Sequence, residues 1–289
     1  MKQRIARVTH GAWMGITREA RAGAARRAWI AVFGAALIAW FASGCGSGAG
    51  TSSTGSSTAA SGAGAEAPPA SALAPVHGAY SPTINPASFV GRIDNRWFPL
   101  KPGTGFHYKG VAEDGTTPQS DDMVVTHQTK DVLGVKCTVV RDVVSSRGKA
   151  IEKTFDWYAQ DKWGNVWYMG EDSRELRHGE FVKVGDSWEG GVNGAKPGII
   201  MPGDPRPGER YRQEFYPGHA LDQARVIGEG GRVKVPNGSY AHTLLTDETA
   251  PKLDPGVHEH KYYVAGLGDI KEQTVAGNHE QIRLVSVTR

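Results

Sequence analysis

The sequence predicts a mainly β protein whose folded part is a single, strongly curved antiparallel sheet, a barrel or half-barrel with little helix. Three observations indicate this fold class. About a dozen short runs rich in Val, Ile, Thr, Tyr and Trp lie between residues 81 and 289. Six Pro-Gly pairs, which are typical of type II turns, punctuate the same region. Helical periodicity is nearly absent, and so many short strands in about 200 residues favour one curved sheet.

Each of these runs is a predicted strand. In chain order they span residues 105–110, 123–129, 137–144, 151–160, 166–170, 208–216, 225–228, 232–235, 242–246, 258–264, 270–275 and 281–287. Between them, residues 218–224 are expected to hold at most a turn or two of helix.

The first 44 residues are predicted to be a signal peptide. They carry seven basic residues and one acidic residue, and a run of 16 uncharged residues follows Arg26 and Arg27. A membrane span needs about 20 apolar residues, so this run is short for one. A basic start, a short apolar core and small residues behind it are typical of a secretion signal. The arginine pair also loosely matches a twin-arginine signal.

Residues 42–45, Ala-Ser-Gly-Cys, resemble a bacterial lipobox, with Ala42 standing where the lipobox usually has Leu. In such signals the cysteine is lipidated and becomes the new N-terminus. We therefore predict lipidation of Cys45 and anchoring to a membrane on the extracytoplasmic side. The alternative is an ordinary signal peptide with an incidental cysteine. Lipidation leaves Cys137 without a disulfide partner, and its strand-like neighbours predict a small core residue.

Residues 45–80 are predicted to comprise the lipidated cysteine and a flexible Gly/Ser/Ala linker, and residues 81–289 the β domain. The linker composition cannot bury enough apolar surface to offset the entropy of ordering. Without residues 1–44 the chain has a net charge of −3, so binding to nucleic acid loses its electrostatic basis. We expect a protein that is held at a membrane, works beside it and has no nucleic-acid partner.

One hairpin can be interpreted residue by residue. If residue 160 lies opposite 166, then Tyr158 lies opposite Tyr168, and Asp156 shares their face. We take Asp156, Tyr158 and Tyr168 as candidates for binding a ligand; a face that simply meets water is the alternative. The other face, which we expect to be core, carries Phe155, Trp157, Ala159, Trp167 and Met169.

Residues 191–207 are predicted to form a long loop with an unusual apolar run. Ile199, Ile200 and Met201 lie next to each other, and a solvated loop rarely carries such a run. The run either plugs the sheet or lines a pocket, and we expect the plug.

The strand predicted after this loop supplies three more ligand-binding candidates. Alternation places Arg212 and Glu214 on one face, either as a surface ion pair or as charged groups at the mouth of an apolar cavity. Lys196, in the preceding loop, is expected near them.

His258 and His260 are the candidate metal ligands. Residues two apart on a strand share a face, so both imidazoles can converge on one ion, with a third ligand from His279 or Glu280. Two histidines on an exposed strand without a metal are the alternative. We predict no cofactor.

Ser187 lies in a Gly-Asp-Ser-Trp sequence that superficially matches the start of a GDS-type esterase motif. That chemistry needs a strand-to-helix elbow, which the sequence does not suggest, so we expect a turn residue. No catalytic residue is predicted, and whether the protein is an enzyme stays open.

Several motifs resemble a family of secreted bacterial proteins and lipoproteins of unknown function. The motifs are IDNRWFPLKPG at 93–103, DWYAQD at 156–161 with GNVWY at 164–168, and AKPGIIMP at 195–202. Residues 261–268 are similar to the YYAPGVG turn of that family and, more loosely, of lipoprotein-carrier-like β proteins, with Val264 and Ala265 in place of Ala-Pro. The resemblance covers about residues 93–287. It implies a curved antiparallel sheet and no particular activity.

These observations predict a lipid-anchored β protein of the cell envelope that binds a small or amphipathic ligand or an envelope component. The alternative is a secreted hydrolase or lyase that acts on a polymer. Its cleft would be lined by Asp156, Tyr158 and Tyr168, with Lys196 or Arg212 as electrophile. No carboxylate pair can be placed at a defined separation from the sequence, which favours the binding protein.

Overall fold

The computed structural model of the chain describes residues 67–289. The predicted signal peptide, Cys45 and most of the predicted linker lie outside these residues. The helices are α2 (Ala70–Leu73) and a 3-10 turn (Pro86–Ser88). The strands are β1 (Phe89–Val90), β2 (Gly105–Val111), β3 (Pro118–Val132), β4 (Val135–Ser146), β5 (Lys149–Asp161), β6 (Val166–Arg177), β7 (Glu180–Lys183), β8 (Trp188–Glu189), β9 (Lys196–Met201), β10 (Arg210–Arg212), β11 (Glu214–Phe215), β12 (Gln223–Val235), β13 (Gly238–Thr249), β14 (His258–Val264), β15 (Gly268–Ala276) and β16 (Gln281–Thr288).

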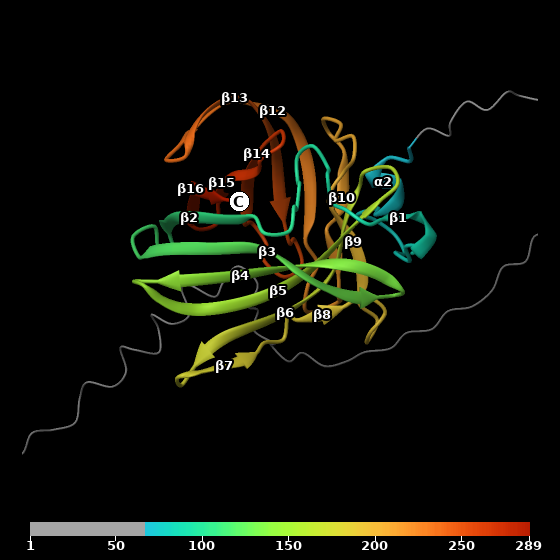
Figure 1. Ribbon diagram of the computed structural model, residues 1–289, viewed down its shortest axis with the longest axis horizontal. Coiled ribbons are helices and arrows are strands. Elements are labelled where there is room, and N and C mark those ends of the chain that lie inside the picture. The colour runs from blue at the N-terminus through green and yellow to red at the C-terminus, as the bar shows by residue number, and fades with distance from the viewer. Residues whose placement is uncertain (1–66) are drawn as a thin grey trace, which may run out of the picture. The chain divides into compact units, whose positions relative to one another are not determined.

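Two antiparallel meanders, β2–β6 and β12–β16, form the sheet, and pairing of β16 with β2 joins them. Figure 1 shows the first meander in green to yellow and the second in orange to red, curving around a common interior. The remaining edges meet through two consecutive short strands, since β10 pairs with β12 and β11 pairs with β9. We call residues 210–215 the closing segment. The predicted curved antiparallel sheet is confirmed as a nearly closed barrel.

The apolar run of residues 199–201 lies in a strand, and the predicted loop is wrong at this point. β9 pairs with β6 on one side and with β11 on the other, so its backbone groups are satisfied within the sheet. Ile199 and Met201 are fully buried, whereas Ile200 lines an interior cavity described below. The run therefore forms part of the barrel wall and does not plug the barrel.

Residues that pack on the barrel also lie before the predicted domain boundary at residue 80. Ala70, Ala74 and Tyr80 are buried in the hydrophobic core cluster. The Tyr80 hydroxyl donates a hydrogen bond to the carbonyl oxygen of Pro197, and the N–H of Arg212 donates to that of Ala74 (2.8 Å). Residues 67–80 thus pack on the barrel and are not part of a free linker.

Residues 93–100 close one end of the barrel, which we call the plugged end. The side chain of Asn95 donates to the carbonyl oxygens of Gly164 (2.8 Å) and Pro202 (2.9 Å). The ring of Phe98 packs edge-to-face against Tyr158 and Tyr263, with centroids 5.5 and 6.5 Å apart. Because these tyrosines belong to β5 and β14, which are not neighbours in the sheet, Phe98 reaches across the interior.

The hairpin of β5 and β6 has the predicted register. Tyr158 lies opposite Tyr168, and residue 160 lies opposite 166. Both faces are nevertheless buried, because the segment before residue 100 covers the outside, where Phe89 packs against Trp167 with centroids 6.3 Å apart. The expected core face is therefore core, and the opposite face lies inside the barrel and does not meet water.

Within the described residues, no helix has the length and apolar character needed to span a membrane.

Candidate functional site

The interior of the barrel is acidic. Three pairs of directly opposed strand partners are acidic on both strands. They are Glu152 with Glu175, Asp156 with Glu171, and Glu248 with Glu259. Five of these six side chains are buried, and the Glu259 side chain is partly exposed. Like charges in directly opposed positions destabilise a sheet, so stability alone does not favour this arrangement.

A cavity of about 150 Å³ lies within this acidic interior. Loops that carry Glu113, Asp254 and Asn278 form its rim, at what we call the open end of the barrel. From there the lining reaches inward to Tyr168. Nine acidic residues line the cavity, against one lysine, Lys261, and one histidine among the described residues.

Lys261, on β14, lies among three of these carboxylates. Its Nζ is 3.2 Å from Oε2 of Glu248 and 3.6 Å from Oε2 of both Glu259 and Glu272. Burial lowers the pKa of Lys261, but the surrounding carboxylates more than offset this and hold the pKa well above its ordinary value. Lys261 is therefore charged, and one ammonium group faces three carboxylates.

Hydrogen bonds fix the positions of these groups. Tyr263 and Thr246 donate through their hydroxyls to Oε1 of Glu248, at 3.2 and 3.0 Å.

Burial, followed by the charge of Glu272, raises the pKa of Asp269 well above its ordinary value. Asp269 therefore keeps its proton more readily than an exposed aspartate does.

The carboxyl groups at the rim titrate above the usual range. Burial, followed by the charges of Glu280 and Asp254, raises the pKa of Glu113 to about 7, against the effect of a 3.1 Å hydrogen bond from the amide of Asn278. Burial and the charge of Asp222 raise the pKa of Asp254. Neither Glu113 nor Asp254 forms an ion pair with any residue in the described part of the chain. The charge at the rim consequently changes with pH near neutrality.

Tyr168 links two buried carboxyl groups deeper in the barrel. Its hydroxyl lies 2.5 Å from Oδ1 of Asp156 and 2.9 Å from Oε2 of Glu171. A phenol has a single proton, so both contacts are full hydrogen bonds only when one carboxyl group is protonated and donates to the phenol oxygen. The ring of Tyr168 stacks on that of Tyr158, with centroids 4.9 Å apart.

The structure separates the predicted ligand-binding residues. Tyr168 and Glu214 line the cavity, and the indole N–H of Trp188 donates to Oε2 of Glu214 at 2.8 Å. Asp156 and Tyr158 are buried beside the cavity and do not line it. The hairpin face therefore does not form the open polymer cleft considered from the sequence.

Lys196 and Arg212 hold the N-terminal segment. The ammonium group of Lys196 donates to the carbonyl oxygen of Tyr80. The guanidinium group of Arg212 donates to the carbonyl oxygens of Pro75 and Val76, both at 2.7 Å. These two residues are thus structural and do not face the cavity.

His258 and His260 lie on the outer face of β14, where His258 is exposed and its Nδ1 is 3.0 Å from Oδ1 of Asp247. Across residues 67–289, no group of three or more His, Cys, Asp or Glu side chains is arranged to hold a metal ion. The geometry therefore gives no support to the predicted metal site.

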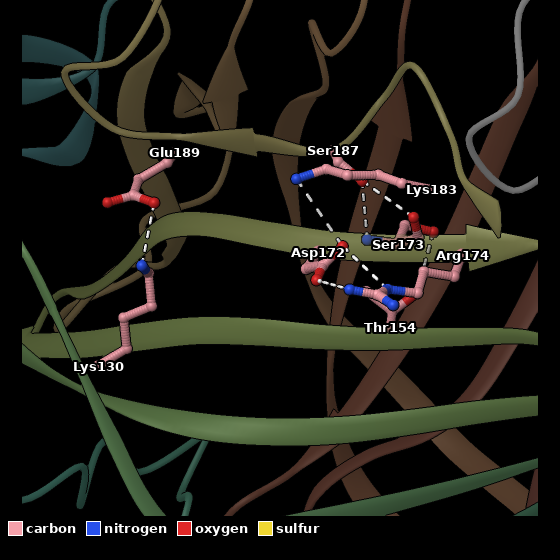
Figure 2. Close-up of polar contacts among 8 residues, drawn as sticks. All are labelled: Lys130, Thr154, Asp172, Ser173, Arg174, Lys183, Ser187 and Glu189. Atoms are coloured by element: carbon pink, nitrogen blue, oxygen red, sulfur yellow. Dashed lines mark hydrogen bonds and ion pairs between the residues drawn. The ribbon is translucent and has the colours of Figure 1, made fainter. Parts of the chain in front are cut away.

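Ser187 pairs with the backbone of β6, as Figure 2 shows. Its hydroxyl accepts a hydrogen bond from the N–H of Ser173 (2.9 Å) and donates one to the carbonyl oxygen of the same residue (3.0 Å). Both bonds serve to dock the turn before β8 on the sheet.

Cys137 is fully buried in β4, and burial raises its pKa to about 12, as expected of a core residue.

The interpretation of the sequence missed most of the cavity. Glu259 and Lys261 alternate with His258 and His260, the candidate metal ligands, and they occupy the inward positions of the same strand. Polar residues at alternate positions of β13 and β15, Thr246 with Glu248 and Glu272 with Thr274, carry the same signal. Because polar residues on a strand usually face solvent, this pattern does not by itself indicate the interior of a barrel.

No protein-family model matches the chain, and no curated protein matches it. Two solved structures each align with 68% of the chain and 100% of their own length, at 11% identity and a TM-score of 0.38. One is described as an inferred exported protein with a YMCC-like fold from Bacteroides fragilis NCTC 9343, the other as an inferred lipoprotein from Parabacteroides distasonis ATCC 8503. At this TM-score and identity the likeness carries no argument about this chain. The family resemblance suggested by the motifs stays a prediction.

Proposed function

We propose that this protein is a lipid-anchored component of the cell envelope, on the extracytoplasmic side, and that it binds a small ligand inside its barrel. The basic start, the short apolar run and Cys45 support export and anchoring. The motif resemblance to secreted bacterial proteins is in keeping with this location.

One observation supports ligand binding above the others. Phe98 fills the plugged end, while the open end leads into a cavity of about 150 Å³ that more polar than apolar residues line. Cores of small barrels are normally filled by apolar side chains, and a retained polar cavity inside a closed sheet is a common form of ligand site.

The weaker candidate is a hydrolase or lyase. The carboxyl groups of Asp156 and Glu171, joined by the hydroxyl of Tyr168, are a pair of the kind that acid–base chemistry uses. These carboxyl groups are buried, and a polymer does not fit a cavity of this volume. We therefore favour a binding protein for a small molecule.

Filling the cavity tests ligand binding. Thr274 lies on β15 and faces the cavity, whereas its neighbour Val275 faces solvent. Thermal unfolding is measured with 1,5-pentanediol, glutarate, cadaverine and octyl glucoside as neutral, anionic, cationic and amphipathic probes. We expect at least one probe to raise the Tm of the wild type and of Val275→Phe, but not that of Thr274→Phe, because only the last variant fills the cavity. No shift with any probe, or an equal shift in all three proteins, would contradict the proposal.

Replacement of Cys45 tests the anchor. The wild-type protein should partition into the detergent phase, and Cys45→Ala should move to the aqueous phase because the lipid is lost. Cys137→Ala serves as the control and should leave partitioning unchanged. A Cys45→Ala protein that stays in the detergent phase would mean that another feature holds the protein at the membrane.

A further inference from the structure

We propose that the ligand of the cavity is a small organic cation that also offers a hydrogen-bond acceptor, such as an amino alcohol. This inference rests on the proposed binding of a small ligand in the cavity and specifies its chemical class. Two independent features of the lining carry it: the balance of charges and the side chain of Gln213.

The charges of the lining favour a cation. Lys261, its one lysine among the described residues, is already engaged by three carboxylates. Glu113 and Asp254, at the rim, have no ion-pair partner in the part of the chain that the structure describes. A cationic ligand that enters from the open end meets these two groups first, and partial burial strengthens its attraction to them.

Gln213 supplies an observation that does not depend on charge. Its side chain is 2% exposed and lines the cavity, and within residues 67–289 its amide nitrogen has no hydrogen-bond partner. Buried donors without a partner are rare in proteins, and one that faces a cavity points to an acceptor on a ligand.

The local backbone explains why this amide faces inward. Gln213 separates β10 from β11, and the N–H groups of Gln213 and Glu214 both point to the carbonyl oxygen of Asp222, at 2.8 and 3.4 Å. This break in the strand lets two consecutive side chains line the same cavity. The closing segment therefore presents a donor and a carboxylate side by side, which suits a ligand with both an acceptor and a positive charge.

The dispersion of the carboxylates argues for an organic cation and against a metal ion. No three His, Cys, Asp or Glu side chains of the described chain converge as metal ligands. The cavity volume of about 150 Å³ is similar to that of an engineered cavity that binds benzene, so the ligand has on the order of six to eight non-hydrogen atoms.

Four probes of matched size separate charge from hydrogen bonding: 5-amino-1-pentanol, hexylamine, 1,5-pentanediol and 5-hydroxypentanoate. Dissociation constants are measured by NMR titration of the full-length protein in a neutral detergent at pH 8. We expect 5-amino-1-pentanol to bind about tenfold more tightly than the diol and the hydroxy acid, and about threefold more tightly than hexylamine, which lacks the acceptor.

Two variants assign these differences to residues. Glu113→Gln should weaken binding of both amines about threefold to tenfold, while the same change at the exposed Glu180 should leave it unchanged. Gln213→Leu should abolish the advantage of 5-amino-1-pentanol over hexylamine without affecting the preference for amines. Unfolding midpoints of all variants establish that they fold, and the four-probe series on the wild type is decisive even if a variant does not.

The failure of this inference differs from failure of the proposed function. The inference is overturned, and the ligand site stands, if the diol or the hydroxy acid binds as tightly as the amines. The same holds if the amines do not bind while another probe binds the wild type but not Thr274→Phe. If no probe of either series binds, both are overturned.

Discussion

At the plugged end of the barrel Asp161 accepts four hydrogen bonds, whereas at the open end Glu113 accepts one, from Asn278, among the described residues. The donors to Asp161 are the N–H groups of Trp163 and Asn165, the Asn165 amide and the Trp167 indole, at 2.9 to 3.0 Å. Both residues are acids of the same barrel, and they differ in the number of donors that the fold supplies to each.

This difference separates structural acids from acids available to a ligand. A buried carboxylate with its full set of donors fixes a turn and stabilises the fold. Carboxylates that outnumber the cations beside them, as around Lys261, weaken the fold by mutual repulsion. Groups that destabilise the fold in this way are more often explained by function than by stability.

The largest effect is expected for Asp161→Ala. It leaves four donors without their acceptor, two of them on buried side chains, and should lower the free energy of unfolding by about 4 kcal/mol. Urea unfolding measures this loss. Asp204→Ala, at an exposed position, is the control and should change stability by less than about 0.5 kcal/mol. A loss below about 1 kcal/mol for Asp161→Ala would contradict a structural role for the acid at the plugged end.

Removal of the ammonium group of Lys261 should have a smaller, pH-dependent effect on the free energy of unfolding. Lys261→Met leaves three carboxylates without their cation and should cost about 3 kcal/mol at pH 8, less at pH 5, where the carboxylates can accept protons. Lys271→Met, on the outer face of the neighbouring strand, should cost about 1 kcal/mol or less at both pH values. Equal losses at pH 5 and pH 8 for Lys261→Met would show that repulsion among the carboxylates is not the cause.

The smallest effect concerns the rim. The folded-state pKa of Glu113, about 7, lies above its ordinary value of 4.5, so the folded protein holds the proton more tightly than the unfolded chain. The resulting stability is fully present below pH 4.5 and is lost as the pH rises through 7. Glu113 is only partly buried, so solvent screens its charge, and we expect wild type to lose only about 1 kcal/mol more than Glu113→Gln between pH 5 and pH 8 in urea unfolding. Parallel pH profiles for the two proteins would refute a titrating rim.

The sequence was sufficient to predict the plan of the sheet and the register of its best hairpin. Alternation and turn residues are local properties, and they determined that Tyr158 lies opposite Tyr168. Turn residues did not reveal that the apolar run at 199–201 belongs to a strand. This run pairs with β6 and β11, and local rules consider only residues that are close together in the sequence.

The cavity could not be predicted in the same way. Alternation sorts residues 258–261 into two faces, and it does not tell which face lies inside when both are polar. Closure of the sheet decides this, and closure depends on the pairing of β10 and β11 with strands on opposite edges. The break at Gln213 that directs its amide inward arises from a hydrogen bond to Asp222, which alternation does not anticipate.

The attachment of residues 67–80 also has a mechanical consequence. Arg212 donates hydrogen bonds to the carbonyl groups of residues 75 and 76, and Tyr80 donates one to Pro197 on β9. The chain therefore enters the barrel beside the closing segment. A pull applied at residue 67 would load these side-chain contacts before any strand pair. The hydrogen bonds of the guanidinium group and the phenol can break and re-form while the hydrogen bonds between strands stay intact. The barrel would therefore resist tension that is transmitted along the chain.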